Sequence, residues 1–227
     1  MEELPNKCED PLTTFVINLD TATDRWEHYK DKGCKRWSAT SYDEISVNSP
    51  EIKKLVSYHN LSMKEHLCKL ACLKSHMNLW RYITQNQMNN ILVLEDDAQL
   101  VRPVPPTYKF RDDGITYLGG YTSHIHVTKG AKKISLEEGI HIINHNEYRV
   151  LMTMSYFIPN WKVAEKLLNN MMYAERWRAI DVMMRDFTGL TQSISYPASF
   201  KERPTQSQIK KKKRSKFANE FYEMVKV

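Results

Sequence analysis

Three consecutive acidic residues, Glu95, Asp96 and Asp97, follow a run of aliphatic residues in the segment NNILVLEDDAQL, residues 89–100. Carboxylates this close together repel one another unless a cation lies among them or water solvates them well. Their oxygen atoms suit hard cations such as Mn²⁺ or Mg²⁺ and do not suit zinc. The segment therefore predicts a metal site, with a solvated strand end as the alternative.

The residues before these acids, NILVL, have the composition of a buried strand. Other strand patterns occur in TTFVINL (13–19), KRWSAT (35–40), GITYLGG (114–120), GIHIINH (139–145), RVLMTMSYFIP (149–159) and TQSISYP (191–197). Helix patterns occur in DRWEHYKDKG (24–33, closed by Gly33), in residues 66–87 after a capping box of Ser62 and Glu65, and in residues 160–172 and 178–187. This alternation predicts an α/β fold with a mostly parallel central sheet flanked by helices. In such sheets ligands bind at the carboxyl ends of the strands, which is where the three acids lie.

The composition is typical of one soluble globular domain, with 227 residues, 41% hydrophobic and 26% charged. The acidic, polar start MEELPNKCED is not a secretory signal, and no apolar run reaches the roughly 18 residues that span a bilayer, so we expect a cytoplasmic protein. The four cysteines (Cys8, Cys34, Cys68 and Cys72) form no CxxC pair and are expected to be reduced thiols.

The net charge of +6 is local, because the segment KKKKRSK (210–216) alone contains six basic side chains. This distribution argues against a nucleic-acid-binding surface, on which basic residues would spread over a face. The run Lys210–Arg214 has three interpretations: a solvated tail, a basic lid over a diphosphate, or a peripheral membrane contact.

Three enzyme classes place acids at such a strand end. A Walker-B strand requires a partner loop G-x-x-x-x-G-K-[ST], which is absent from the sequence. A receiver domain would carry its acidic pocket nearer the N-terminus and at several strand ends. A nucleotide-sugar transferase of the GT-A type, in which acids hold a metal on the sugar diphosphate, fits best.

The segments FVINLDTATDR, KRWSAT, ACLKSHMNLW and NILVLEDDA, in this order and spacing, resemble glycosyltransferase family 25, which includes lipooligosaccharide and collagen galactosyltransferases. The later segments YLGG, TMSYFIPNWKVAEKLL, AIDVMM and YPASFKERPTQS extend the resemblance over roughly residues 13–208. One departure is Ala71, where the family commonly has glycine. The resemblance implies a GT-A-type, Rossmann-like single domain at 13–208, with an N-terminal extension (1–12) and a basic C-terminal tail or helix (209–227).

The resemblance also implies roles for residues of the donor site. Asp97, with Glu95 or Asp96, would hold Mn²⁺ or Mg²⁺. The expected nucleotide-sugar-binding residues are Asn18, Leu19, Asp20, Arg25, Arg36, Ala39, Ser75, His76, Glu95 and Asp96. Arg25 has two possible partners, a phosphate and the acidic cluster, and a surface arginine is the alternative. A buried, hydrogen-bonded core residue is the alternative for His76.

On the acceptor side, Asp181 in RAIDVMM matches the family's late aspartate and is the candidate base that takes the proton of the acceptor hydroxyl in an inverting transfer. Its alternative is a helix N-terminal acid without chemistry, and the weaker contenders are Glu175, Asp186 and the pair Asp112–Asp113. Tyr121 and His124, on an expected loop, are candidate acceptor contacts.

The sequence thus predicts an enzyme that transfers a sugar of the galactose, glucose or xylose class from a UDP-sugar to a hydroxyl of a glycan or glycoconjugate. A catalytically inactive nucleotide-sugar-binding or glycan-binding protein of the same fold is the main alternative. A Mg²⁺-dependent phosphotransferase is a second one, which the missing glycine-rich phosphate loop disfavours. The oligomeric state is not predicted.

Overall fold

The central element of the computed structural model is a seven-stranded sheet in the order β2-β1-β3-β9-β5-β10-β7. The structure describes residues 11–55, 62–124, 137–143 and 148–203. The strands are β1 (Thr13–Asn18), β2 (Lys35–Ser38), β3 (Ile91–Glu95), β5 (Gly114–Tyr117), β7 (Gly139–Ile142), β9 (Ser155–Ile158) and β10 (Thr191–Tyr196). Five of them run in one direction, and β9 and β7 run against it. This arrangement confirms the expected α/β fold with a mostly parallel sheet.

Alternating side chains on the central strands supply two separate cores, as the period of two in a strand requires. Phe15 and Ile17 of β1, with Val93 of β3, belong to a large core that also contains the apolar residues of α3 and α4. Val16 and Leu92 point the other way, into a smaller core on the opposite face. Because the strands are buried on both faces, they have the continuous aliphatic sequences that the sequence analysis used to find them.

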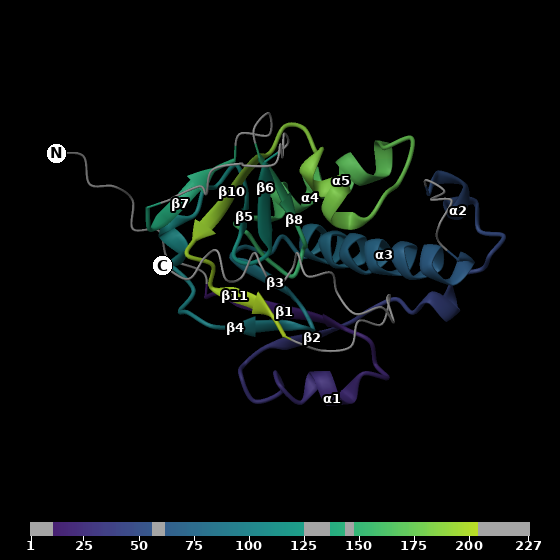
Figure 1. Cartoon of the computed structure of the whole chain (residues 1–227), viewed down its shortest axis with the longest axis horizontal. Helices are drawn as coiled ribbons and strands as arrows, with labels where there is room; N and C mark the ends of the chain where they lie inside the picture. The colour runs from purple at the N-terminus through teal and green to yellow at the C-terminus, as the bar shows by residue number, and fades with distance from the viewer. Residues whose placement is uncertain (1–10, 56–61, 125–136, 144–147, 204–227) are drawn as a thin grey trace.

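Most helices cover the face of the larger core, whereas Trp26 of the first helix packs against the smaller core. The helices are α1 (Thr23–Trp26), α2 (Pro50–Lys54), α3 (Met63–Gln85), α4 (Trp161–Tyr173) and α5 (Ile180–Arg185). The long α3 packs against α4, and α5 contacts both α3 and β8 (Figure 1). The predicted capping box forms at the start of α3, where the Ser62 side chain accepts from the Glu65 amide and the Glu65 side chain accepts from the Ser62 amide.

Two short antiparallel pairs flank the main sheet. In one, β4 (Ala98–Leu100) pairs with β11 (Phe200–Glu202), which brings the end of the described chain beside the acidic segment. In the other, β6 (Tyr121–His124) pairs with β8 (Tyr148–Leu151). None of β4, β6 and β11 was predicted, because three or four residues are too few to show a clear period.

Two predicted elements are wrong in extent. The helix expected over 24–33 ends at Trp26, and turns continue the chain to Gly33, whose φ of +68° suits a residue without a side chain. The single strand expected over 149–159 is divided into β8 and β9 by Met152, which has φ of +74°. A left-handed residue breaks the pleat, so one strand cannot continue through it.

Other expectations concern the ends of the chain and the thiols. Lys210–Arg214 and Cys8 lie outside the described residues. Cys34, Cys68 and Cys72 are free thiols and half-buried. No helix in the described segments has the length and apolar character to cross a bilayer.

The side chain of Asp113 joins the amino ends of β5 and β10, and its contribution to stability can be tested. Its carboxylate accepts from Arg111 at 2.9 Å and from the Thr191 hydroxyl at 2.8 Å, and these hydrogen bonds lower its pKa to about 2. Because the folded pKa is below the usual value of 3.8, the stabilisation is present above about pH 4 and is lost as the pH falls toward 2. For this exposed group we expect Asp113→Asn to cost about 1 kcal/mol or less at pH 6, measured by thermal unfolding.

The melting temperatures of Asp113→Asn and the wild type should converge as the pH is lowered toward 2. The exposed Asp31 supplies the control, because Asp31→Asn changes the charge equally. A difference for Asp113→Asn that does not depend on pH would contradict this account.

Candidate active site

The ends of four neighbouring strands meet at one edge of the sheet. In the parallel ladder Asn18 lies beside Ser38, and Glu95 lies beside Ile17. Since β9 runs in the opposite direction, its first residue, Ser155, is paired with Leu94 at the same edge. The acidic cluster predicted from sequence is therefore surrounded by the ends of β1 and β2 and the start of β9, as expected for a ligand site in an α/β sheet.

Asp96 does not face an open site, because two side chains of the protein bind it. Arg25 from α1 donates to one carboxylate oxygen at 2.6 Å, and Asn18 donates to the other at 2.8 Å. The side chains of Arg25 and Asp96 are only 12% and 13% exposed. Of the partners considered for Arg25, the structure therefore shows the acidic cluster, and the surface arginine is excluded.

Asn18 and Arg36 form the adjoining part of the edge. The buried Asn18 accepts from Nε of Arg36 at 2.8 Å, and a second Arg36 nitrogen donates to the Leu19 carbonyl at 2.9 Å. The Arg36 guanidinium also lies over the Trp26 ring, 5.6 Å from its centroid. The contacts hold this cation in place while 27% of its side chain remains exposed.

The remaining residues predicted for the donor side lie around the end of β2. The Asp20 side chain is 70% exposed and accepts from the Ser38 hydroxyl at 2.6 Å. The Ala39 amide donates to the Asn18 carbonyl. Ser75 of α3 accepts from the Thr40 amide at 2.9 Å and donates to the carbonyl one turn earlier in its helix. Ser75 thus joins α3 to the segment after β2.

Glu95 faces the interior beside α3. Its Oε1 accepts a short hydrogen bond from the Thr153 hydroxyl and lies 3.5 Å from Nε2 of His76. Burial acts to raise the pKa of Glu95, but the contacts with His76 and with the Thr153 hydroxyl outweigh burial and lower it. His76 is fully buried and its Nδ1 is 2.8 Å from the Tyr156 hydroxyl, so it is a hydrogen-bonded core residue that also faces the acidic cluster.

The three acids have different partners. Asp96 is held by Arg25, Glu95 approaches His76, and the Asp97 backbone carbonyl accepts from the Arg203 amide at 2.7 Å. Within the part of the chain that the structure describes, the one group of three potential metal ligands within 4.8 Å of one another is Cys72, His76 and Glu95. The expectation that Asp97, with Glu95 or Asp96, holds a cation stays a prediction.

A hard cation on a nucleotide diphosphate nonetheless fits the donor set. Mg²⁺ and Mn²⁺ bound with phosphates use one or two protein carboxylates, and phosphate and water oxygens complete the coordination. Glu95 and Asp97 are half-buried carboxylates from the same strand end, and Asp96 balances one of the nearby positive charges. Two carboxylates are sufficient for that role.

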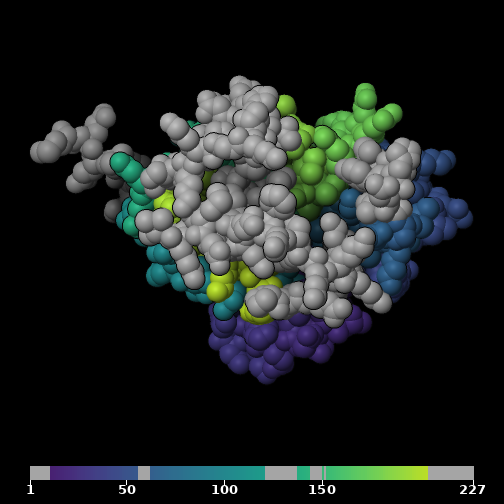
Figure 2. All heavy atoms as spheres, in the orientation of Figure 1, coloured from purple at the N-terminus to yellow at the C-terminus, as the bar shows by residue number. Residues whose placement is uncertain are grey.

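Asp181 comes from the opposite half of the molecule and reaches the same region. In Figure 2 the purple surface of the segment with α1 and the green surface of the segment with α5 lie at different ends of the face shown. One oxygen of Asp181 accepts from the Val182 amide at 2.8 Å and the other from the Met152 amide at 3.3 Å. The next residue, Thr153, donates to Glu95. Two consecutive residues, Met152 and Thr153, therefore connect Asp181 with the acidic cluster.

The thiol of Cys72 is influenced by the same acids. Burial raises its pKa well above the usual value, and four carboxylates add to the rise: Glu95, Asp181, Asp97 and Asp96. Because Coulomb interactions weaken with distance, all four negative charges lie near this thiol. The structure thus brings the predicted base and the predicted metal ligands into one neighbourhood.

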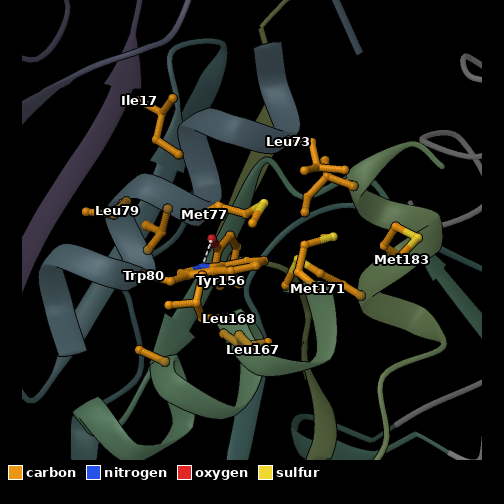
Figure 3. Packing of buried hydrophobic residues seen from close by; sticks show 14 of the residues in the cluster. Ile17, Leu73, Met77, Leu79, Trp80, Tyr156, Leu167, Leu168, Met171 and Met183 are labelled. Carbon is orange, nitrogen blue, oxygen red and sulfur yellow. Dashed lines mark hydrogen bonds between the residues drawn. The ribbon is translucent and has the colours of Figure 1, made fainter. Parts of the chain in front are cut away.

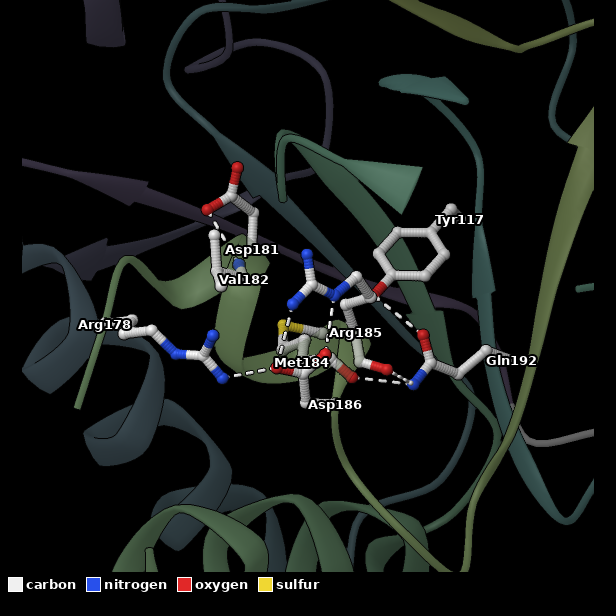
Figure 4. A network of polar contacts seen from close by, with 8 residues as sticks. All are labelled: Tyr117, Arg178, Asp181, Val182, Met184, Arg185, Asp186 and Gln192. Carbon is white, nitrogen blue, oxygen red and sulfur yellow. Dashed lines mark hydrogen bonds and ion pairs between the residues drawn. The ribbon is translucent and has the colours of Figure 1, made fainter. Parts of the chain in front are cut away.

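The weaker contenders for the base are placed differently. Asp186 forms ion pairs with Arg178 and Arg185, as Figure 4 shows, and these arginines outweigh burial and lower its pKa. Glu175 is exposed. Asp112 and Asp113 precede β5 and therefore lie at the opposite edge of the sheet. Of these acids, Asp181 alone is near the cluster.

The candidate acceptor residues Tyr121 and His124 lie on β6, which pairs with β8. The expectation that they belong to a loop is wrong, because the backbone pairing continues from Tyr121 to His124. Their side chains are outside what the structure describes.

Sequence analysis missed Thr153, Tyr156 and the backbone of Met152 as parts of this region. Thr153 and Tyr156 stood inside an apolar run that was assigned to a single core strand. The spacing of Cys72 and His76, four apart on a helix, was the available signal that both lie on one face.

Because Arg25 pairs with Asp96, we expect Asp96 to be the acid of the cluster that stabilises the fold. Asp96→Asn keeps the shape but removes the charge that Arg25 faces, so we expect a loss of about 2 kcal/mol, between the values for exposed and fully buried pairs. Denaturant unfolding measures it, with the exposed Asp24→Asn on α1 as control, for which we expect a change below about 0.5 kcal/mol. Equal effects of the two substitutions would show that the pair does not stabilise this edge.

Comparison with known families agrees with the geometry. The chain matches the model of glycosyltransferase family 25, described as an LPS biosynthesis protein family, over residues 12–184. No individual curated protein matches the sequence. The matched region begins before β1 and ends in α5, so it contains both the acidic cluster and Asp181. Since the match covers well over half of the 227 residues, the chain belongs to glycosyltransferase family 25, as its sequence motifs predicted.

Proposed function

We propose that this glycosyltransferase moves a sugar of the galactose, glucose or xylose class from a UDP-sugar to a hydroxyl group of a glycan or glycoconjugate, with inversion and with Mn²⁺ or Mg²⁺. The observation that carries the proposal is the link from Asp181 to Glu95 through the consecutive residues Met152 and Thr153. It supports a base and a cation-binding acidic cluster on either side of one reacting centre.

On the donor side, Asp20 and Arg36 are the proposed direct contacts of the nucleotide. Asp20 follows β1 with a side chain that is 70% exposed, and Arg36 of β2 is held by hydrogen bonds while 27% of its side chain stays exposed. Asn18, Arg25 and Asp96 bind one another, so we assign them the task of shaping the pocket. Ser75, with Leu19 and Ala39, holds the segments around the nucleoside in position.

Glu95 and Asp97 would hold the cation, which when bound supplies positive charge to the diphosphate as negative charge builds on it. The contacts of Glu95 with His76 and Thr153 outweigh burial and lower its pKa, so its carboxylate is ionised at neutral pH. His76, behind Glu95, supports that carboxylate and does not face the sugar in this proposal.

In the transfer, Asp181 takes the proton of the acceptor hydroxyl. The acceptor oxygen forms the new bond to the anomeric carbon on the side opposite the leaving group. The bond from that carbon to the diphosphate oxygen breaks, and its electron pair leaves with the diphosphate. Inversion follows from attack on the opposite side. Tyr121 and His124 are the proposed acceptor contacts, because β6 pairs with the strand that leads to Met152.

A protein of this family that binds a nucleotide sugar without turning it over is the competing function. The two possibilities differ in what Asp181 does, since a binding protein needs no base. They agree in the requirement for a donor site, so binding and turnover are tested separately.

UDP binding should require both the metal and Asp97. By calorimetric titration we expect Asp97→Ala to weaken UDP binding in the presence of Mn²⁺ by at least about tenfold, or about 1.4 kcal/mol. Removal of Mn²⁺ from the wild type should have a similar effect. Asp24→Ala, on the exposed side of α1, should bind as the wild type does. Binding that is indifferent to both metal and Asp97 would refute the metal-dependent donor site.

Asp181→Asn should lower turnover by about 10²–10⁴-fold and leave the affinity for UDP unchanged, because an amide cannot accept the proton. Turnover is measured as UDP release in a screen of donors and acceptors. Glu175→Gln, an exposed carboxylate on the same segment, is the matched control and should keep full activity. Wild-type turnover that survives in Asp181→Asn would exclude this residue as the base.

A further inference from the structure

A row of buried polar side chains runs from α3 through β9 to the end of β3. The indole nitrogen of Trp80 is 2.9 Å from the Tyr156 hydroxyl, which is 2.8 Å from Nδ1 of His76. Nε2 of the same imidazole lies 3.5 Å from Oε1 of Glu95. Trp80, Tyr156 and His76 are fully buried, and Figure 3 shows the first contact inside the large core. Buried polar groups in such a core must satisfy one another.

The chemistry of the indole and the phenol determines which group donates and which accepts at each contact of the row. An indole N–H can only donate, so the Tyr156 oxygen accepts from Trp80. The phenolic proton then has Nδ1 of His76 as its acceptor. Burial raises the pKa of Tyr156 well above its usual value, which keeps that proton on the oxygen. With Nδ1 accepting, the imidazole carries its N–H on Nε2.

That N–H is directed at Glu95. The 3.5 Å separation from Oε1 is long for a hydrogen bond, and Nε2 makes no other hydrogen bond among the described residues. The Thr153 hydroxyl donates to the same carboxylate oxygen. Both contacts approach Oε1, and within the described segments no hydrogen bond is assigned to Oε2.

We propose that Trp80, Tyr156 and His76 are positioning residues that, with Thr153, turn Oε1 of Glu95 toward the protein and present Oε2 to the cation and diphosphate of the donor. The role of Glu95 as a ligand rests on the proposed function, whereas the orientation of the hydrogen bonds does not. Hydrogen-bonded outer residues of this kind hold a ligating carboxylate in one direction and strengthen metal binding.

The competing use of the same residues is a metal ion bound by Cys72, His76 and Glu95, whose ligand atoms lie within 4.8 Å of one another. A cation on Nε2 needs the lone pair of that nitrogen, so the imidazole proton would move to Nδ1 and point at Tyr156. Tyr156 would then accept from both His76 and Trp80, and its own proton would lose its acceptor. The hydrogen bonds therefore favour the positioning role.

The protonated nitrogen of His76 distinguishes the two arrangements directly. In a two-bond ¹H–¹⁵N correlation spectrum of the metal-free, ¹⁵N-labelled chain, Nε2 is the ring nitrogen that correlates with both carbon-bound ring protons. His76→Gln assigns the signals by their loss. We expect a protonated Nε2 and an unprotonated Nδ1. The opposite pattern, or a shift of Nε2 on addition of Zn²⁺ that Cys72→Ser abolishes, would overturn the proposal and assign a metal site to Cys72, His76 and Glu95.

Isosteric variants test what the row does for Glu95. Thr153→Val and Tyr156→Phe each remove one hydroxyl, and we expect each to weaken Mn²⁺ binding, measured by titration in the presence of UDP, by about 10- to 100-fold. Thr153→Ser restores the hydroxyl and should restore the affinity, which a purely structural role of the residue would not require. In Tyr156→Phe the His76 signals should no longer show a single tautomer.

The results separate this inference from the proposed function. Loss of metal affinity in Thr153→Val with recovery in Thr153→Ser supports positioning of Glu95. Unchanged Mn²⁺ affinity in Thr153→Val and Tyr156→Phe, together with metal-dependent UDP binding by the wild type, would refute the positioning role and leave the donor site intact. Thermal unfolding of each variant shows whether it is folded at the temperature of the titration.

Discussion

The carboxylate of Asp96 is the contact on which the edge of the sheet around the candidate site depends. It receives one hydrogen bond from Arg25 and one from Asn18, so it ties β3 to β1 and to α1. Taking these charges out of water has a cost, which the two short hydrogen bonds offset. The guanidinium also neutralises one of three adjacent negative charges, which lowers the repulsion among them.

A second constraint lies at Met152, which joins Asp181 to the residue that contacts Glu95. Its φ of +74° is unfavourable for a residue with a side chain, by roughly 1–2 kcal/mol. Pairing of β8 with β6, and of β9 with β3, holds the chain on both sides of this residue. In this strained conformation the Met152 amide donates to Asp181, and the side chain of the next residue, Thr153, donates to Glu95. Strained backbone of this kind is characteristic of functional sites.

The central strands β1 and β3 could be predicted from the sequence because both of their faces are buried, which leaves an almost uninterrupted aliphatic signature. The start of α3 could also be predicted, because Ser62 and Glu65 form a local capping motif. The division of residues 149–159 was not, because nothing in the side chain of Met152 indicates a left-handed backbone. Pairing partners also escape local patterns, so β6 was taken for a loop and the contact of Thr153 with Glu95 was missed.

The three acids of the cluster all have carboxylate side chains and adjacent positions, so the sequence alone could not assign a separate role to each carboxylate. Each acid meets a different neighbour: Glu95 meets His76 and Thr153 inside the core edge, Asp96 meets Arg25, and Asp97 begins the turn toward β4. A cation that used Asp96 would have to displace a guanidinium that is 12% exposed, and breaking a buried pair costs about 3–5 kcal/mol. Neither Glu95 nor Asp97 belongs to that ion pair. The central acid therefore serves the fold, and the proposed metal role belongs to its two neighbours.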